Sequence, residues 1–120
     1  MLLLTPEMVA AVYECLRQFP PFSRWKLPPA DEVEFRVSNK RNTMGEYTRY
    51  VRTTDHIVTV SALTIGHFST LANVVSHEMV HLKQALDKTE PKRVGVHNAE
   101  YRRPARQVCK FHGWDDKAFV

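Results

Sequence analysis

The segment that constrains the fold most is residues 69–87, where apolar side chains recur at the spacing of a buried helix. Residues three and four apart share one face of an α-helix, so this pattern predicts a helix that lies against a core. Ser69 or Thr70 is suited to cap its start, and the pattern runs through to Asp87. The positions that follow the helical spacing are Leu71, Val74, Val75, Glu78, Leu82, Ala85 and Leu86.

Two histidines, His77 and His81, lie four residues apart in this predicted helix, and Glu78 directly follows the first. Because positions i and i+4 lie one turn apart, both imidazoles can face a single metal ion. Glu78 is rotated by about 100° from His77, so it misses the ion but can reach a water bound to it. In a zinc hydrolase the metal lowers the pKa of its water and such a glutamate takes the proton. The alternative is an ordinary amphipathic helix with two solvated histidines.

The residues around this HExxH motif favour the metal site over that alternative. Much of the helix should be buried, and buried imidazoles and carboxylates need compensating partners. A metal ion would be such a partner. The apolar residues around the motif are Val74, Val75, Met79, Val80 and Leu82.

Catalytic zinc takes three protein ligands and one water, and the stretch after the helix offers two candidates for the third ligand. His97 follows His81 by 16 residues, and Glu100 follows it by 19. We prefer His97, because a turn containing Gly95 can fold it back over the motif. Glu100 would then support a ligand from outside, although a first-turn acid that complements the helix dipole explains it at least as well.

Tyrosines are candidates for contact with the ligands or the substrate, because a phenol can donate a hydrogen bond to an oxyanion. Tyr47, Tyr50 and Tyr101 have this capacity, and Tyr101 follows the predicted ligand most closely. Most buried tyrosines simply pack. The other three histidines are expected to be structural: His56 in a strand, His67 before the central helix, and His112 in a last helical turn, where a partly charged ring suits the dipole.

Outside the central helix, the sequence predicts two more helices. One begins at Thr5-Pro6 and ends before the proline-rich loop 20–29, which Trp25 and Leu27 should pin to the core. The other begins near Asn98 and ends at His112, with Gly113 as its stop; Pro104 inside it either kinks the helix or marks a later start.

Three strands are predicted between the first two helices. Residues 33–38, 46–52 and 56–61 carry alternating or β-branched side chains separated by turns. Short connections between them favour an antiparallel meander. The order helix, three strands, helix, helix makes an α+β domain.

Composition suits one domain over residues 1–120, with 43% hydrophobic and 25% charged residues. No apolar run approaches the length of a membrane span, and the first residues lack the basic start of a signal peptide. Cys15 and Cys109 form no CxxC pair, so we expect reduced, buried thiols in a cytoplasmic protein without a membrane partner.

Residues 56–81, HIVTVSALTIGHFSTLANVVSHEMVH, together with HNAEY at 97–101 and MGEYTRY at 44–50, resemble the SprT-like metallopeptidases. The resemblance covers roughly residues 44–112. It implies a zincin-like core, Zn²⁺ held by His77, His81 and His97, Glu78 as the base, and protein substrates. It also implies stimulation by DNA in several members. Asn98 stands where the family usually has glycine.

Two functions follow from these features. The first is a zinc endopeptidase in which Glu78 activates a zinc-bound water and the strand His56–Ser61, at a sheet edge, holds an extended protein or peptide substrate. The second is a non-catalytic domain with a structural metal that binds nucleic acid, DNA included, through a basic surface. The net charge of +4 suits the second, although the cations are scattered along the chain. Four of them lie in the last helix: Arg102, Arg103, Arg106 and Lys110.

Overall fold

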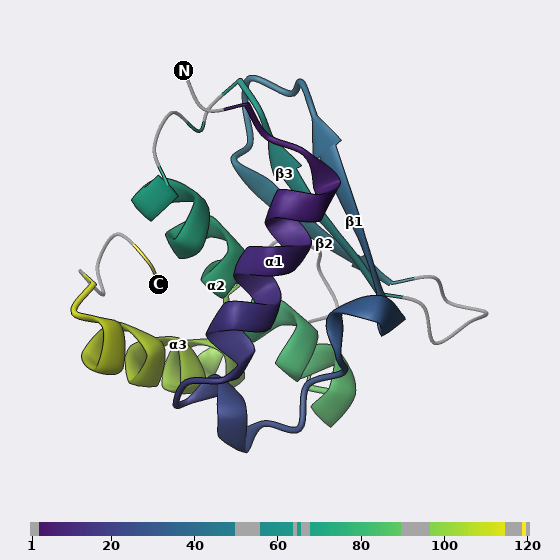
Figure 1. Cartoon of the computed structure of the whole chain (residues 1–120). Coiled ribbons are helices and arrows are strands. Elements are labelled where there is room, and N and C mark those ends of the chain that lie inside the picture. Colours follow the sequence, from purple (N-terminus) through teal and green to yellow (C-terminus); the bar gives the residue numbers. More distant parts are fainter. Residues whose placement is uncertain are drawn as a thin grey trace.

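The computed structural model describes residues 3–49, 56–63, 65, 68–89, 97–114 and 119 (Figure 1). Within these residues the fold is a small α+β domain, as predicted, with the elements in the predicted order. One short 3-10 turn, Phe22–Arg24, lies within the proline-rich loop, and a second, Ala30–Glu32, directly follows it. The helices and strands are α1 (Pro6–Arg17), β1 (Val33–Ser38), β2 (Gly45–Arg49), β3 (His56–Ser61), α2 (Phe68–Asp87) and α3 (Ala99–His112).

Helix α1 starts as its sequence predicts, because the Thr5 side chain accepts a hydrogen bond from the Met8 amide at 3.2 Å. The following loop is anchored to this helix: Tyr13 Oη donates to the Pro28 carbonyl at 2.6 Å. Leu27 is 4% exposed and Trp25 packs against the core, so the predicted pinning of the loop is confirmed.

The three strands form a mixed sheet in the order β1-β3-β2, so the predicted antiparallel meander is wrong. The central strand β3 is parallel to β1 and antiparallel to β2. Residues 39–44 join β1 to β2, and at about 3.3 Å per residue this link can cross the roughly 10 Å that one intervening strand occupies. The space left between them suits β3, which is buried at nearly every position.

The sheet is covered on one face by helices α1 and α2, which cross each other beside it in Figure 1. The strand register aligns Phe35 of β1, Val58 of β3 and Tyr47 of β2 across this face. The Phe35 ring lies 5.3 Å from that of Tyr13 on α1, and Val58 is fully buried. The hydrophobic core therefore lies between the sheet and these two helices.

Helix α2 ends at Asp87 as predicted and begins at Phe68, slightly before the expected cap. Helix α3 packs against it and matches its prediction closely. Asn98 caps α3, the helix continues through Pro104, and Gly113 ends it with a φ of 75°, a left-handed conformation that favours glycine.

Two other expectations have mixed outcomes. Cys109 is buried, but Cys15 is exposed on α1, which corrects the expectation that both thiols are buried; the two form no disulfide. Among the described residues, no helix is both long and apolar enough to span a bilayer.

Candidate metal centre

Helix α2 presents His77 and His81 on one side, with ring centroids 5.1 Å apart. Their position is fixed by the opposite side of the helix, where Val75, Met79 and Leu82 are fully buried in the core. Both histidines are themselves half-buried. The HExxH spacing therefore places both imidazoles on one face of α2, as helical geometry predicts, and the two rings face the same volume.

His97, directly before α3, completes the cluster. Its ring centroid lies 5.0 Å from that of His77 and 5.2 Å from that of His81. Potential ligand atoms of the three histidines all lie within 4.8 Å of one another, close enough to bind a metal ion. The structure thus brings together the three histidines that the sequence singled out.

The donor set fits a zinc ion in geometry. Tetrahedral zinc with Zn–N bonds of about 2.0–2.1 Å places its ligand nitrogens about 3.3–3.4 Å apart. The widest separation here is at most 4.8 Å, so closing the cluster requires relative movements of about 1.5 Å or less. Small rotations of the imidazole rings supply displacements of that size.

The protonation of the cluster also suits a cation. Burial, with the charges of His81 and His97 added to it, lowers the pKa of His77 to about 3. Burial and the charge of His97 lower the pKa of His81 to about 4. Both rings are therefore neutral near pH 7, and the neutral imidazole is the form that binds metals.

Glu78 lies beside the cluster in a pocket almost closed to solvent, with 4% of the residue exposed. Burial first, and then the charge of Glu46, raises the pKa of its carboxyl to about 8. A nearby cation favours the ionised form of a carboxyl group and would lower this pKa. A cation bound at the histidine cluster would therefore favour the ionised form of Glu78.

Strand β2 closes one side of the Glu78 pocket, and a glycine makes this possible. A Cβ added to Gly45 would lie 2.9 Å from Oε2 of Glu78 and 2.7 Å from Cγ1 of Val74. Both separations are shorter than Cβ contacts normally are, so only glycine lets the strand backbone lie this close to α2. Sequence reasoning missed Gly45, because the contact joins residues far apart in the chain.

Tyr101 contacts all three histidines of the cluster, which the sequence alone did not indicate. Its hydroxyl lies 2.7 Å from Nδ1 of His77. Its ring stacks on those of His97 and His81, with centroids 3.9 and 4.6 Å away. Burial raises the pKa of this fully buried tyrosine, so the hydroxyl keeps its proton and can donate it to an imidazole nitrogen.

The remaining sequence candidates lie outside the cluster. Glu100 is exposed in the first turn of α3, where it complements the helix dipole, and it is not part of the histidine group. His56 is buried in β3, and its Nδ1 lies 2.5 Å from the Tyr47 hydroxyl, which agrees with a structural role. His67 and Tyr50 lie outside the described residues.

His112 corrects the expectation of a partly charged ring. It lies among aromatic rings, 5.8 Å from Phe22 and 5.0 Å from Trp114 between centroids. Burial lowers its pKa, and this outweighs a hydrogen bond to the Pro20 backbone that raises it. Desolvation therefore prevails over the helix dipole and disfavours the charged form of the ring.

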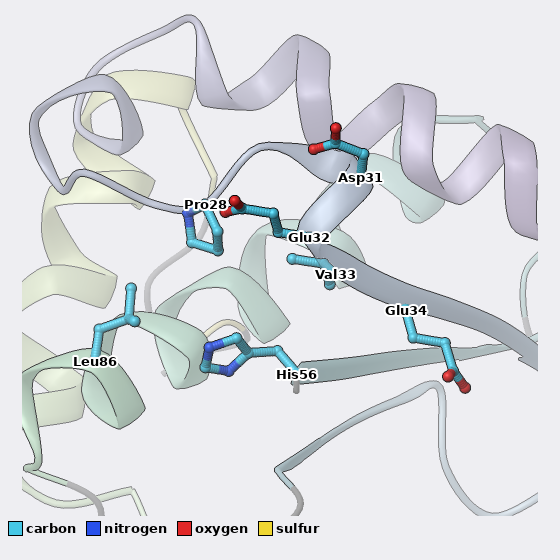
Figure 2. Close-up of a pocket in the computed structure, with 7 residues that line it drawn as sticks. All are labelled: Pro28, Asp31, Glu32, Val33, Glu34, His56 and Leu86. Carbon is cyan, nitrogen blue, oxygen red and sulfur yellow. The ribbon is translucent and has the colours of Figure 1, made fainter. Parts of the chain in front are cut away.

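A groove of about 750 Å³ lies apart from the histidine cluster, between the start of the sheet and the end of α2. Figure 2 shows Pro28, Glu32 and Val33 on one side of this groove and His56 and Leu86 on the other; Asp31 and Glu34 also line it. No residue of the cluster lines this groove. Within the described residues, the three histidines are the only group that could hold a metal ion.

Comparison of the chain with protein-family models, with curated proteins and with solved structures gives no match. The resemblance to the SprT-like metallopeptidases therefore depends on the motif residues alone. What this site does has to be inferred from its own geometry and chemistry.

Proposed function

We propose that this protein is a zinc-dependent endopeptidase whose ion is held by His77, His81 and His97. The observation that supports this most is the composition of the cluster. Three imidazoles converge, and no fourth histidine, cysteine or acid joins them among the described residues. Structural zinc usually has four protein ligands, whereas catalytic zinc has three and leaves one position for water.

Within this proposal, zinc would supply a water of lowered pKa and an electrophile for the substrate carbonyl. Glu78 would take the proton from that water, because it lies on the same helix as two ligands and is shielded from solvent. It would then return the proton to the leaving amine. Tyr101 would hold the His77 ring in place through its hydroxyl.

We propose that an extended peptide binds along β2. The strand expected for this role, His56–Ser61, is the central strand β3 and is already paired on both sides, so it cannot accept another strand. In the described part of the sheet, β2 is an edge strand, and its first residue, Gly45, adjoins the Glu78 carboxylate. Backbone pairing along β2 would therefore lead a substrate toward the base.

Replacing the base tests the reaction. Glu78→Gln keeps all three histidines, so it should retain one tightly bound zinc while losing casein cleavage by at least 10²-fold, roughly the contribution of a general base. The matched control is Glu100→Gln, the same change at an exposed glutamate of α3. Cleavage of casein by Glu78→Gln at the wild-type rate would refute the mechanism.

A basic surface, formed by residues of α3 together with Arg24, favours nucleic-acid binding as a second function. Its cations are exposed, and their side chains make no ion pair or hydrogen bond with another described residue. One of them, Lys110, lines a groove of about 480 Å³ together with Arg24 and Phe111, a ring that is 52% exposed. Exposed cations beside an exposed aromatic ring suit a single strand. The basic surface consists of Arg24, Arg102, Arg103, Arg106, Lys110 and Phe111.

Salt-dependent binding of a fluorescent oligo-dT tests this surface. Removing one phosphate contact, as in Arg106→Ala, should lower the slope of log affinity against log salt by about 0.7. Lys40→Ala, at an exposed lysine outside α3, is the control. Glu78→Gln should bind the oligonucleotide as the wild type does. Binding that is weak and insensitive to salt would exclude this function and leave the peptidase proposal untouched.

A further inference from the structure

A buried glutamine connects the two segments that carry the metal ligands. Gln84 lies on α2, one turn after His81, and only 1% of it is exposed. Its Nε2 donates to Oδ1 of Asn98 at 2.8 Å and to the Thr89 carbonyl at 3.2 Å. A fully buried amide is costly unless it is hydrogen-bonded, so these contacts hold the Gln84 side chain in one orientation.

Asn98 completes a closed set of hydrogen bonds. Its Nδ2 donates to the same Thr89 carbonyl at 3.2 Å, and its Oδ1 accepts from the Tyr101 amide at 3.0 Å. Asn98 directly follows His97, and Tyr101 stacks on the His97 ring. We call the two side-chain amides of Gln84 and Asn98, with the Thr89 carbonyl, the amide bridge.

The oxygen end of the Gln84 amide is also buried. The Thr89 carbonyl can only accept, so the NH₂ group of Gln84 must point toward it. Oε1 is then left buried without a hydrogen-bond partner among the described residues. Gln84 follows His81 by three residues on α2, so the two side chains share one face of the helix. A metal-binding histidine commonly donates its other N–H to an acceptor of this kind.

We propose that the amide bridge is the positioning device of the metal centre: Gln84 orients His81, and through Asn98 it fixes the segment that carries His97. This inference depends on the proposed metal site but not on peptidase activity. Asn98 serves two roles at once, because its side chain supplies both the helix cap and the acceptor for Gln84.

Zinc affinity of the purified protein, measured by competition with a chelator, tests the bridge without any substrate. Gln84→Met keeps the size of the side chain and removes its hydrogen bonds, and Asn98→Ser keeps a helix cap but is too short to reach Gln84. Each should weaken zinc binding by about 10–100-fold, the usual effect of removing a group that orients a ligand. The double variant should be no weaker than the weaker single variant, because both changes break one unit.

Two controls separate positioning from loss of fold. Asn98→Asp keeps the oxygen that accepts from Gln84 and from the Tyr101 amide but loses the Nδ2 contact with the Thr89 carbonyl, so it should weaken zinc binding less than Asn98→Ser does. Val108→Ala creates a cavity in the core face of α3 away from the bridge, so it should lower the melting temperature without changing zinc affinity. The visible spectrum of the Co²⁺-loaded protein should change in Gln84→Met and stay constant in Val108→Ala.

Three results would overturn the inference: wild-type zinc affinity in Gln84→Met and Asn98→Ser, equal weakening in Asn98→Asp and Asn98→Ser, or an equal loss in Val108→Ala. A wild-type protein that binds zinc but cleaves no casein would overturn the proposed peptidase activity and leave the bridge standing.

Discussion

The contact between β2 and Glu78 gives the sharpest prediction, because one methyl group perturbs it. In Gly45→Ala the new Cβ would lie 2.7 Å from Cγ1 of Val74, 2.9 Å from Oε2 of Glu78 and 3.3 Å from the Thr59 carbonyl. The first two separations must widen by several tenths of an ångström, so the Val74 or Glu78 side chain, or the backbone of β2 or α2, has to shift. The pairing of β2 with the central strand restricts movement of β2 itself.

Two opposing terms set the magnitude for stability. Overpacking a tight interior costs about 1–3 kcal/mol. Alanine offsets about 0.4–1 kcal/mol of this by restricting the unfolded chain more than glycine does. We therefore expect Gly45→Ala to lower the free energy of unfolding by about 0.5–2 kcal/mol, measured in urea. Displacing Glu78 should also reduce kcat for casein by up to about 10²-fold, as misplaced catalytic groups do.

Gly113→Ala is the matched control. It places alanine at a φ of 75° with nothing within 4 Å of its Cβ, so it carries backbone strain without a clash. It should lower stability by a comparable amount and leave kcat unchanged, because the end of α3 lies away from Glu78. Equal kcat in Gly45→Ala and the wild type, at full stability, would show that the strand does not adjoin the base and would refute the reasoning.

Three further predictions concern the histidines. His97→Ala should remove the stabilisation of about 2.7 kcal/mol that zinc at 100 times its Kd gives the wild type, seen as the loss of the zinc-induced rise in melting temperature. Tyr101→Phe keeps the ring stack and removes the contact with His77, so zinc affinity should fall by about 10-fold in chelator competition, and an unchanged affinity would exclude the contact. The pKa of His112 is lower in the folded chain than its unfolded value of 6.5. The contribution of this ring to the free energy of unfolding is therefore complete above pH 6.5 and is lost as the pH falls below that value. His112→Phe should therefore reduce the acid sensitivity of the melting temperature between pH 6.5 and 5, and an identical pH profile would contradict this.

Local patterns allowed the helices and the centre of the site to be predicted. The apolar spacing of α2 fixes which side is buried, and this in turn places His77 and His81 together. Asn98 and Gly113 mark both ends of α3 because capping and left-handed termination depend on single residues. His97 required one further assumption, that the chain turns back toward α2, and the structure satisfies it.

The sheet order and the supporting contacts lay beyond the sequence because they join distant segments. Alternation identifies a strand but not its neighbours, so it does not reveal that β3 lies at the centre of the sheet and not at its edge. Gly45 matters only through its approach to Glu78. In the sequence, Gln84 looks like an ordinary polar residue of a helix. Its role becomes clear only from its hydrogen bond to Asn98 at the start of α3. The burial of both β3 and Gln84 is visible only in the folded chain.

The candidate metal ligands lie on both sides of the junction between α2 and α3, so a bound ion would affect how the domain opens. An ion held by His81 and His97 would fasten a 16-residue interval of the chain, acting as a reversible cross-link between the central helix and the C-terminal one. Backbone amides of α3 should then exchange with deuterated solvent in a single cooperative step that slows sharply once zinc is bound. Helix α3 should open more readily in the apo protein, so limited proteolysis should digest the apo protein faster than the zinc-loaded protein.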